Sequence, residues 1–243
     1  MNFYAMLNFF PLEYREVFNP DPVRVGLRAF PAGVGTTVGA VLGNALLTWF
    51  KGHNKTILVI GCCMMTAFSG ALAAVTPERE GLSIALGTMT GLGVGLVLVP
   101  SITVAVTVTP DHTIATCVAL SLSVRAIGGA IGSAVYYNVY LNKVQTYIPQ
   151  YVAEYVIKAG LPPGNVKGFI ETFLADPTKT EGIPGVTEKV IEAATIGTRW
   201  AYGKSLEYVW LSSIAFGGCA MLLCLAVEDI SKYMTSRVAA RLT

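Results

Sequence analysis

The fold class is decided by the stretch GLSIALGTMTGLGVGLVLVPSITVAVTVTP, residues 81–110, which has no acidic or basic residue in 30 consecutive positions. About 20 apolar residues are enough for a helix to cross the roughly 30 Å hydrocarbon core of a bilayer. A helix is expected because lipid offers no hydrogen-bond partner to an unpaired backbone group. A transmembrane barrel would show segments of about 10 residues with strict alternation, and this stretch is longer and continuously apolar.

Four further windows of similar length predict four more spanning helices. Three of them carry no charged residue, and the fourth, residues 113–142, carries Arg125 alone. Each window holds about 20 residues or more, so each is long enough to cross the bilayer. We therefore predict an all-α integral membrane protein with complete helices over about residues 27–50, 56–76, 81–109, 113–141 and 206–227.

The overall composition excludes several other classes of protein. Of the 243 residues 53% are hydrophobic and 13% charged, whereas a typical soluble domain is about 25% charged. The net charge of +2 provides no broad basic surface, so we expect the lipid bilayer and no nucleic acid as a partner. The sequence has no Walker A motif, no nucleophile motif and no histidine or cysteine pair at metal-ligand spacing. We therefore expect neither an enzyme nor a bound metal or other cofactor.

The segments outside the complete helices have different characters. Residues 1–10, MNFYAMLNFF, are apolar but too short to span, and we interpret them as the end of a spanning helix whose beginning is missing. A complete interfacial anchor is the alternative. Residues 143–205 hold amphipathic pieces between prolines and are predicted to fold as a cap outside the membrane bundle of residues 1–142. Residues 206–243 comprise the last helix and a short charged tail.

Glycines at spacings of four residues predict close helix packing. In lipid there is little hydrophobic attraction between helices, so small residues that let two backbones approach supply dispersion contacts instead. The same smooth faces would let helices rock during alternating access, and generic packing is the alternative. Two prolines inside the spans each remove a backbone hydrogen bond and are expected to kink their helices. The residues concerned are Gly35, Gly39, Gly43, Gly87, Gly91, Gly95, Gly128, Gly132, Pro31 and Pro100.

Arg125 is the one charged residue deep inside a predicted span, about 12 residues from either end. An arginine at the bilayer centre costs about 2.5–3.5 kcal/mol on insertion scales, so it is expected to face the bundle interior or an aqueous cavity. Its role is either a substrate or gating contact or a structural one. A structural contact would be to helix carbonyls, or to a carboxylate outside this sequence, because no other span has an acidic residue at that depth.

Polar and aromatic residues further along the same helix extend this candidate site. Tyrosines near the end of a span commonly form an interfacial belt, and a substrate-stacking role is the alternative. Two residues of the N-terminal apolar segment are added to the prediction. The predicted substrate path comprises Arg125, Tyr136, Tyr137, Asn138, Asn8 and Phe9.

A resemblance to fungal major facilitator transporters is carried by SLSVRAIGGAIGSAVYYNVYLNK (Ser121–Lys143), which resembles their penultimate helix. The more specific likeness is to the 14-span drug:proton antiporters that include the trichothecene efflux pumps. The segment DHTIATCVALSLS (Asp111–Ser123) resembles the cytosolic turn and the start of that helix in the family. The segment PVRVGLRAFPAGVGTTVGAVLGNALL (Pro22–Leu47) resembles the second helix of the C-terminal half. The resemblance runs in order along essentially the whole chain. It implies the C-terminal half of a major facilitator fold, with its first helix cut short.

The resemblance also implies an orientation. The turn at Lys51–Lys55 would be cytosolic, at the place where the superfamily repeats its Gly-x3-Asp-Arg-x-Gly-Arg-Arg motif. The aspartate of that motif is absent here, which puts its gating role in doubt. Residues 143–205 would face the outside, and the tail after the last helix would be cytosolic.

The function implied is efflux of small amphipathic organic molecules, with protons as the counter-ion. Carriers of this superfamily bind substrate between two halves, so the chain would pair with an N-terminal six-helix half and would not transport alone. The plasma membrane is the expected location, with the vacuolar membrane as the alternative. Siderophore-type uptake and a non-transporting membrane scaffold that pairs with another half are the competing functions.

Overall fold

The computed structural model describes residues 1–18, 20–50, 53–175, 185–227 and 230, all of them helical or in short connections without any strand. The α-helices are α1 (Asn2–Glu13), α2 (Pro22–Trp49), α3 (Asn54–Ala71), α4 (Glu80–Val108), α5 (Ile114–Lys158), α6 (Val166–Ala175) and α7 (Glu188–Leu225). Shorter segments are the π-helix η1 (Tyr14–Phe18) and the 3-10 helices η2 (Leu72–Ala74), η3 (Asp111–Thr113) and η4 (Pro163–Asn165). Lys51 of the predicted cytosolic turn and most of the predicted tail lie outside the described residues.

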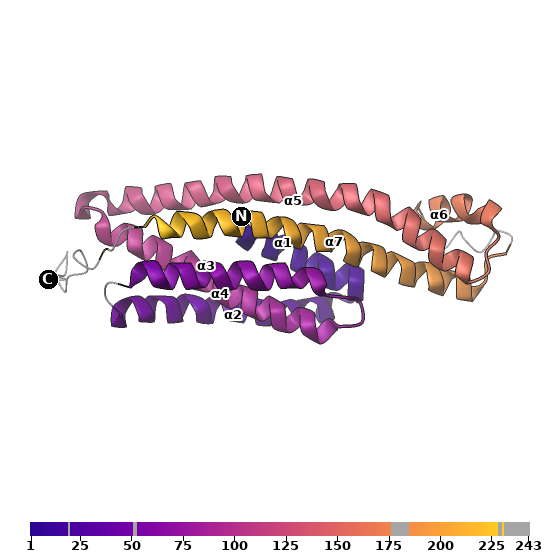
Figure 1. The fold of residues 1–243 in the computed structure, drawn as a ribbon, viewed down its shortest axis with the longest axis horizontal. Helices are drawn as coiled ribbons and strands as arrows, with labels where there is room; N and C mark the ends of the chain where they lie inside the picture. The colour runs from indigo at the N-terminus through magenta and orange to yellow at the C-terminus, as the bar shows by residue number, and fades with distance from the viewer. Residues whose placement is uncertain (19, 51–52, 176–184, 228–229, 231–243) are drawn as a thin grey trace.

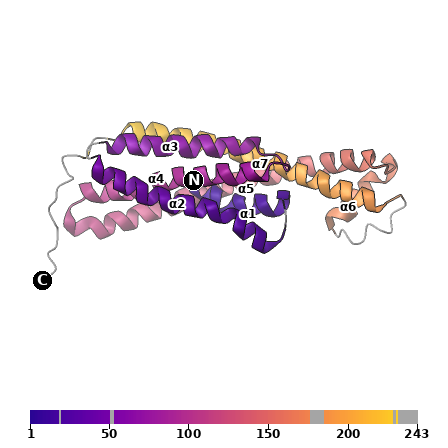
Figure 2. The ribbon, with the colours of Figure 1, turned by 90° about the horizontal axis from the view of Figure 1, so that it is seen from below.

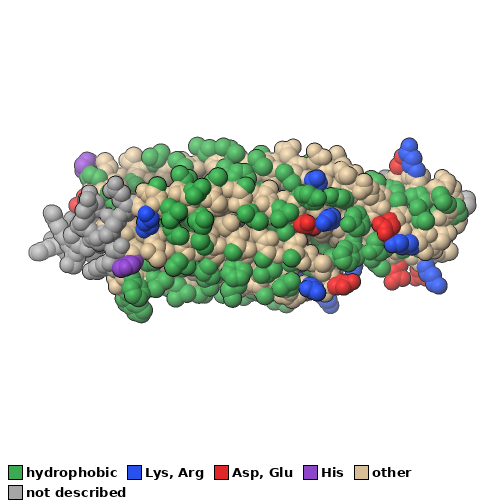
Figure 3. Space-filling model, in the orientation of Figure 1, with side chains coloured by type: hydrophobic (Ala, Val, Ile, Leu, Met, Phe, Trp, Pro, Cys, Tyr) green, Lys and Arg blue, Asp and Glu red, His purple; other side chains and the backbone are tan. Residues whose placement is uncertain are grey.

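Five helices of the described chain are long and apolar enough to cross a membrane. They are α2, α3 with η2, α4, α5 with η3, and α7. Figure 3 shows a middle zone covered by hydrophobic side chains, with acidic and basic side chains toward the ends of the molecule. An apolar zone flanked by charge is what a lipid bilayer requires of the protein surface. The predicted all-α membrane class is confirmed, and the chain is a multi-pass integral membrane protein.

The helices form an elongated bundle, and α1 packs against four of its long helices. Helix α2 packs along α4, α3 contacts both α4 and α7, and α5 runs beside α7. Helix α1 touches α5, α7, α2 and α4, so its aromatic residues reach the centre of the largest hydrophobic core. Figures 1 and 2 show α5 and α7 extending together beyond the other helices, with α6 near their tip.

Helix α2 begins at Pro22, upstream of the uncharged window, because the residues there favour a helix start. The Asp21 carboxylate accepts a hydrogen bond from the Val23 backbone N–H at 3.1 Å, and Pro22 occupies the first helical position. An aspartate cap and a proline at the first position both favour a helix start. The predicted start near residue 27 therefore marks the edge of the apolar zone, and the helix itself begins earlier.

Helices α5 and α7 likewise continue past the windows that predicted them. Helix α5 ends at Lys158, where the window ended near 141, and α7 starts at Glu188, where the window started near 206. An uncharged window reports where a helix can meet lipid, whereas an amphipathic helix continues into water without a break. Most of the described part of the predicted cap is therefore helix continued from two spans.

These extensions have a hydrophobic core of their own. Val152 and Val156 of α5 lie one helical turn apart and are fully buried. They belong to a cluster that also holds Phe169 of α6 and Val190 and Ala194 of α7. Three helices that bury apolar residues against each other explain why this segment folds outside the main bundle.

Helix α1 also extends beyond its predicted end at residue 10. Pro11 lies within α1, and the helix runs on through Glu13 into η1. No sequence pattern marks Glu13 as a buried residue, yet its side chain is buried. A carboxylate that follows an apolar helix is usually solvated, and its burial here comes from the packing of α4 and α7 around α1.

The glycines of α2 and α4 meet in one interface. A Cβ on Gly39 would collide with the backbone oxygen of Leu92, and a Cβ on Gly95 would collide with that of Thr36. Gly35 and Gly91 are equally close to backbone atoms of the facing helix, so neither position has room for a side chain. Backbone contact of this kind is what small residues at a spacing of four permit.

The four other predicted glycines have different surroundings. Gly43 faces the ring of Pro100 in the same α2–α4 interface, and Gly87 faces Phe10 of α1. Gly132 of α5 faces Met1, whereas Gly128 has nothing within 4 Å of a Cβ position. The contact on that face of α5 is made by the next residue, Gly129, against the Tyr4 ring. The reason is rotational: one residue turns the position by about 100° around the helix, which takes Gly128 off the contact face.

The contact between α3 and α7 allows a direct chemical test. Cys62 Sγ of α3 and Cys224 Sγ of α7 lie 3.5 Å apart. We expect copper–phenanthroline oxidation to join these two thiols in the purified protein, because they are already in van der Waals contact. Mass spectrometry of digested protein should find the Cys62–Cys224 peptide pair, and Cys62→Ser should abolish it. Cross-linking of Cys117 in place of this pair would contradict the packing of α3 on α7.

Candidate functional site

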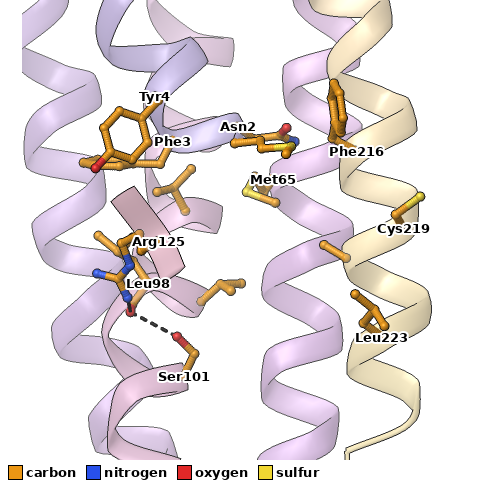
Figure 4. A pocket seen from close by; sticks show the side chains of 14 residues that line it. Asn2, Phe3, Tyr4, Met65, Leu98, Ser101, Arg125, Phe216, Cys219 and Leu223 are labelled. Carbon is orange, nitrogen blue, oxygen red and sulfur yellow. Dashed lines mark hydrogen bonds between the residues drawn. The ribbon is translucent and has the colours of Figure 1, made fainter. Parts of the chain in front are cut away.

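A cavity of about 450 Å³ lies within the apolar part of the bundle. Its walls come from α1, α3, α4, α5 and α7, as Figure 4 shows. Most lining side chains are apolar, among them Phe3, Met65, Leu98, Phe216 and Leu223. The polar groups of the wall include Arg125, Asn2 and Ser101. A mostly apolar pocket of a few hundred Å³ with a few polar groups is typical of small-molecule binding sites.

Arg125 lies in the wall of this cavity and contacts a helix carbonyl there. Its Nη2 donates a hydrogen bond of 2.6 Å to the backbone oxygen of Leu98 in α4 (Figure 4). Ser101 Oγ also donates to that oxygen, at 3.1 Å. A guanidinium has five N–H donors, so one bond to Leu98 leaves others for a bound molecule. The structure thus contains the predicted carbonyl contact, and it also places Arg125 in the wall of the cavity.

A polar network crosses the bundle next to the cavity. Asn2 Oδ1 accepts a hydrogen bond from Tyr136 Oη at 3.0 Å, and Asn2 Nδ2 donates to the Ser213 backbone oxygen at 3.2 Å. Ser213 Oγ lies 2.7 Å from Ser69 Oγ. The network joins α5, α1, α7 and α3 through buried groups, each of which has a partner, as buried polar groups require.

The remaining predicted path residues lie in three different settings. Phe9 is buried beside Tyr136, with ring centroids 6.3 Å apart in an edge-on arrangement. Asn8 is exposed, and its Nδ2 donates to Ser133 Oγ at 3.2 Å. Tyr137 and Asn138 are exposed on the outer face of α5, away from the cavity. Only Arg125 of the six lines the cavity. Tyr136 packs edge-on against the cavity residue Phe216, and Phe9 packs against Tyr136.

Several cavity residues carried no signal in the sequence. Phe216 and Leu223 are apolar residues in an apolar span, so nothing distinguishes them from lipid-facing neighbours. Asn2 was detectable as one of two amides in an apolar helix, since a buried amide needs a hydrogen-bond partner, but the pattern does not distinguish it from the exposed Asn8. Asn2 is 6% exposed and makes the two hydrogen bonds described above.

A second buried polar cluster lies at the far end of α1 from the cavity. Glu13 is 3% exposed, and its Oε1 and Oε2 accept hydrogen bonds from Ser83 Oγ at 2.7 Å and from Trp210 Nε1 at 3.1 Å. Glu13 lies outside the five candidate spans, and burial raises the pKa of its carboxyl to about 7 against the lowering effect of these two donors. Nearby, Arg28 Nη2 donates to Glu80 Oε2 at 2.8 Å in a two-bond pair.

Comparison with known proteins identifies the family. A family model described as fungal trichothecene efflux pump (TRI12) matches residues 26–243, which is most of the chain. The chain belongs to the fungal trichothecene efflux pump family. The resemblance drawn from Ser121–Lys143 is thereby confirmed.

Curated relatives of the trichothecene efflux pump family cover most of this chain but less of their own length. The trichothecene efflux pump TRI12 of Fusarium sporotrichioides is 23% identical over 87% of this chain and 35% of its own. An MFS-type transporter of the acurin A biosynthesis cluster in Aspergillus aculeatus is 25% identical over 90% of this chain and 38% of its own. The TRI12 pump of Trichoderma arundinaceum is 24% identical over 96% and 40%.

The chain therefore spans about 35–40% of the length of these relatives. They are major facilitator transporters, and the five long helices found here are consistent with half of that fold. No solved structure matches the chain at a significant level.

Proposed function

We propose that the chain is the substrate-binding C-terminal half of an efflux carrier for small amphipathic organic molecules, driven by proton antiport. Membership of a family of efflux pumps supports transport as the general function. The observation that carries the proposal for this chain is the cavity with Arg125 in its wall. Apolar walls suit a largely hydrocarbon molecule, and the guanidinium suits an oxygen acceptor on it.

A partner half is part of the proposal. The chain covers about two fifths or less of its relatives, and carriers of this superfamily bind substrate between two halves. Helices α2 and α5 expose apolar side chains along their lengths, among them Phe30, Val38, Val124 and Ile131. An N-terminal six-helix half would cover part of these faces. By itself the chain would bind substrate without transporting it, and no enzymatic activity is proposed.

The proposed location is the plasma membrane, because export from the cell requires it; the vacuolar membrane is the alternative. The ends of α2 and α3 around Phe50 and His53 would face the cytosol, and the α5–α6–α7 extension would face outside. The one N-glycosylation sequon, Asn54-Lys55-Thr56, would then stay unmodified in cells. A glycan on Asn54 would reverse this orientation.

Transport can be measured in yeast cells that lack their own drug pumps. We expect this chain, co-expressed with the N-terminal half of the Fusarium relative, to lower the accumulation of a fluorescent amphipathic dye. The chain alone should leave accumulation unchanged. If the separate halves fail to co-purify, the two are fused into one polypeptide and the measurement is repeated.

Each competing function gives a different result in this experiment. Raised accumulation would indicate uptake in place of efflux. Unchanged accumulation by a pair that co-purifies would indicate a scaffold. Lowered accumulation by the chain alone would contradict the need for a second half.

A further inference from the structure

The Glu13 carboxylate occupies an enclosed position between three helices. It comes from α1, and its two oxygens accept hydrogen bonds from Ser83 of α4 and Trp210 of α7. Both donor residues are themselves buried, as is the neighbouring Tyr14. The carboxylate thus bridges α1 to two spanning helices from a site with almost no contact with solvent.

The hydrogen-bond partners that the structure describes for the Glu13 carboxylate are both neutral. In the described part of the chain, no lysine or arginine lies within ion-pair distance of Glu13. Arg28 of α2 pairs with Glu80 of α4 through Nε and Nη2, and its buried Nη1 has no hydrogen-bond partner among the described residues. Tyr14 Oη lies 3.4 Å from Ser83 Oγ and carries no charge to offer.

Other charged side chains near Glu13, on η1 and α7, form ion pairs with each other. Arg15 and Glu16 of η1 pair with each other at 3.1 Å, and both are partly exposed. On α7, Glu207 pairs with Lys204 at 2.7 Å. The charged groups of η1 and Glu207 of α7 are therefore paired with other residues, and the two donors to Glu13 are neutral.

A buried carboxylate with neutral partners favours its protonated form. Burial is the largest influence on the Glu13 pKa, and it outweighs the two donors that stabilise the charged form. A carboxyl that binds a proton near neutral pH can alternate between protonated and ionised states under cellular conditions. Separation of α1 from α4 or α7 would hydrate the group and release the proton to water.

We propose that Glu13 is a proton-binding site whose occupancy is coupled to the packing of α1 against α4 and α7. This rests on the proton antiport proposed above and assigns one proton site to this half of the carrier. The site lies toward the opposite end of α1 from the cavity at Asn2 and Phe3. Protonation of Glu13 would thus affect substrate binding through α1, because α1 contributes residues to the proton site and to the cavity.

Infrared titration of the purified chain tests the site without any transport. We expect a protonated-carboxyl band that disappears as the pH rises through about 7, and we expect Glu13→Gln to remove it. The matched control is Glu78→Gln, because Glu78 is exposed in the turn before α4. Trp210→Phe removes a donor to the ionised form, so it should move the band's midpoint to higher pH.

Stability provides a second readout of the same group. The pKa of Glu13 in the folded protein, about 7, is above its ordinary value of 4.5. The contribution of Glu13 to the free energy of unfolding is therefore complete below pH 4.5 and is lost as the pH rises through 7. The thermal midpoint of the wild type should fall over this range. Glu13→Gln, which mimics the protonated form, should flatten that dependence.

The transport arm distinguishes this proposal from the proposed function. In the paired carrier, Glu13→Gln should retain dye binding and lose the acceleration of efflux by a proton gradient. Absence of all transport in the wild-type pair would count against the proposed function, while the infrared titration would still decide for or against the proton site. A band unchanged in Glu13→Gln, or an ionised Glu13 down to pH 4.5, would overturn the proposal.

Discussion

Gly39→Ala is expected to prevent the membrane bundle from packing, whereas the same change at Gly33 should leave it intact. A methyl group at Gly39 would collide with the backbone oxygen of Leu92, and neither backbone can yield without separating α2 from α4. Overpacking typically costs 1–3 kcal/mol, and contact with backbone in place of a flexible side chain puts this case at about 3 kcal/mol or more.

Gly33 is a matched control on the same helix. It is exposed, and nothing lies within 4 Å of its Cβ position. Alanine is the better helix former by about 1 kcal/mol, so Gly33→Ala should be neutral or slightly stabilising. The measurement is the thermal midpoint and the monodisperse yield of each variant in detergent. Equal midpoints for the two variants would contradict the α2–α4 interface.

Arg125→Leu is expected to lower efflux by the paired carrier at least about tenfold while the protein still folds. Removing an arginine from the middle of a span relieves an insertion cost of about 2.5–3.5 kcal/mol, so expression should be equal or higher. A hydrogen bond from a charged group to substrate contributes about 1.5–3 kcal/mol. Since 1.4 kcal/mol corresponds to a factor of ten, efflux should fall at least about tenfold.

The same variant separates the two roles foreseen for Arg125. If its bond to the Leu98 oxygen were mainly structural, Arg125→Leu would lower the thermal midpoint and the yield along with efflux. Arg125→Lys is the control, because it keeps the charge and loses the planar arrangement of donors. Efflux is measured as dye loss from preloaded cells, at equal amounts of protein in the membrane.

The membrane class was predictable because absence of charge is a direct requirement of lipid. The uncharged windows located the five long helices of the described chain, but the ends of α5 and α7 depend on apolar positions such as Val152 and Val190 that pack in a second hydrophobic cluster. The glycine spacing likewise located the α2–α4 contact. It missed the choice between Gly128 and Gly129, which depends on how α5 is rotated toward Tyr4.

The site was less predictable than the fold. Arg125 stood out because a charge in a span needs a special environment, and it lines the cavity. Tyr137 and Asn138 were chosen for polarity near Tyr136, yet adjacent helix positions face different directions, and only Tyr136 points inward. Phe216 and the burial of Glu13 follow from contacts between distant segments, which no local pattern records.

Photo-cross-linking tests the central claim, that substrate binds in the cavity at Arg125, most directly. The probe is an amphipathic dye that carries a benzophenone group, irradiated with the paired carrier and mapped by mass spectrometry. Labelled peptides are expected around Leu98, Ser101 and Phe216, with labelling reduced by unlabelled dye and by Arg125→Leu. Labelling confined to exposed positions such as Val38 and Tyr137, and unaffected by competitor, would contradict the claim.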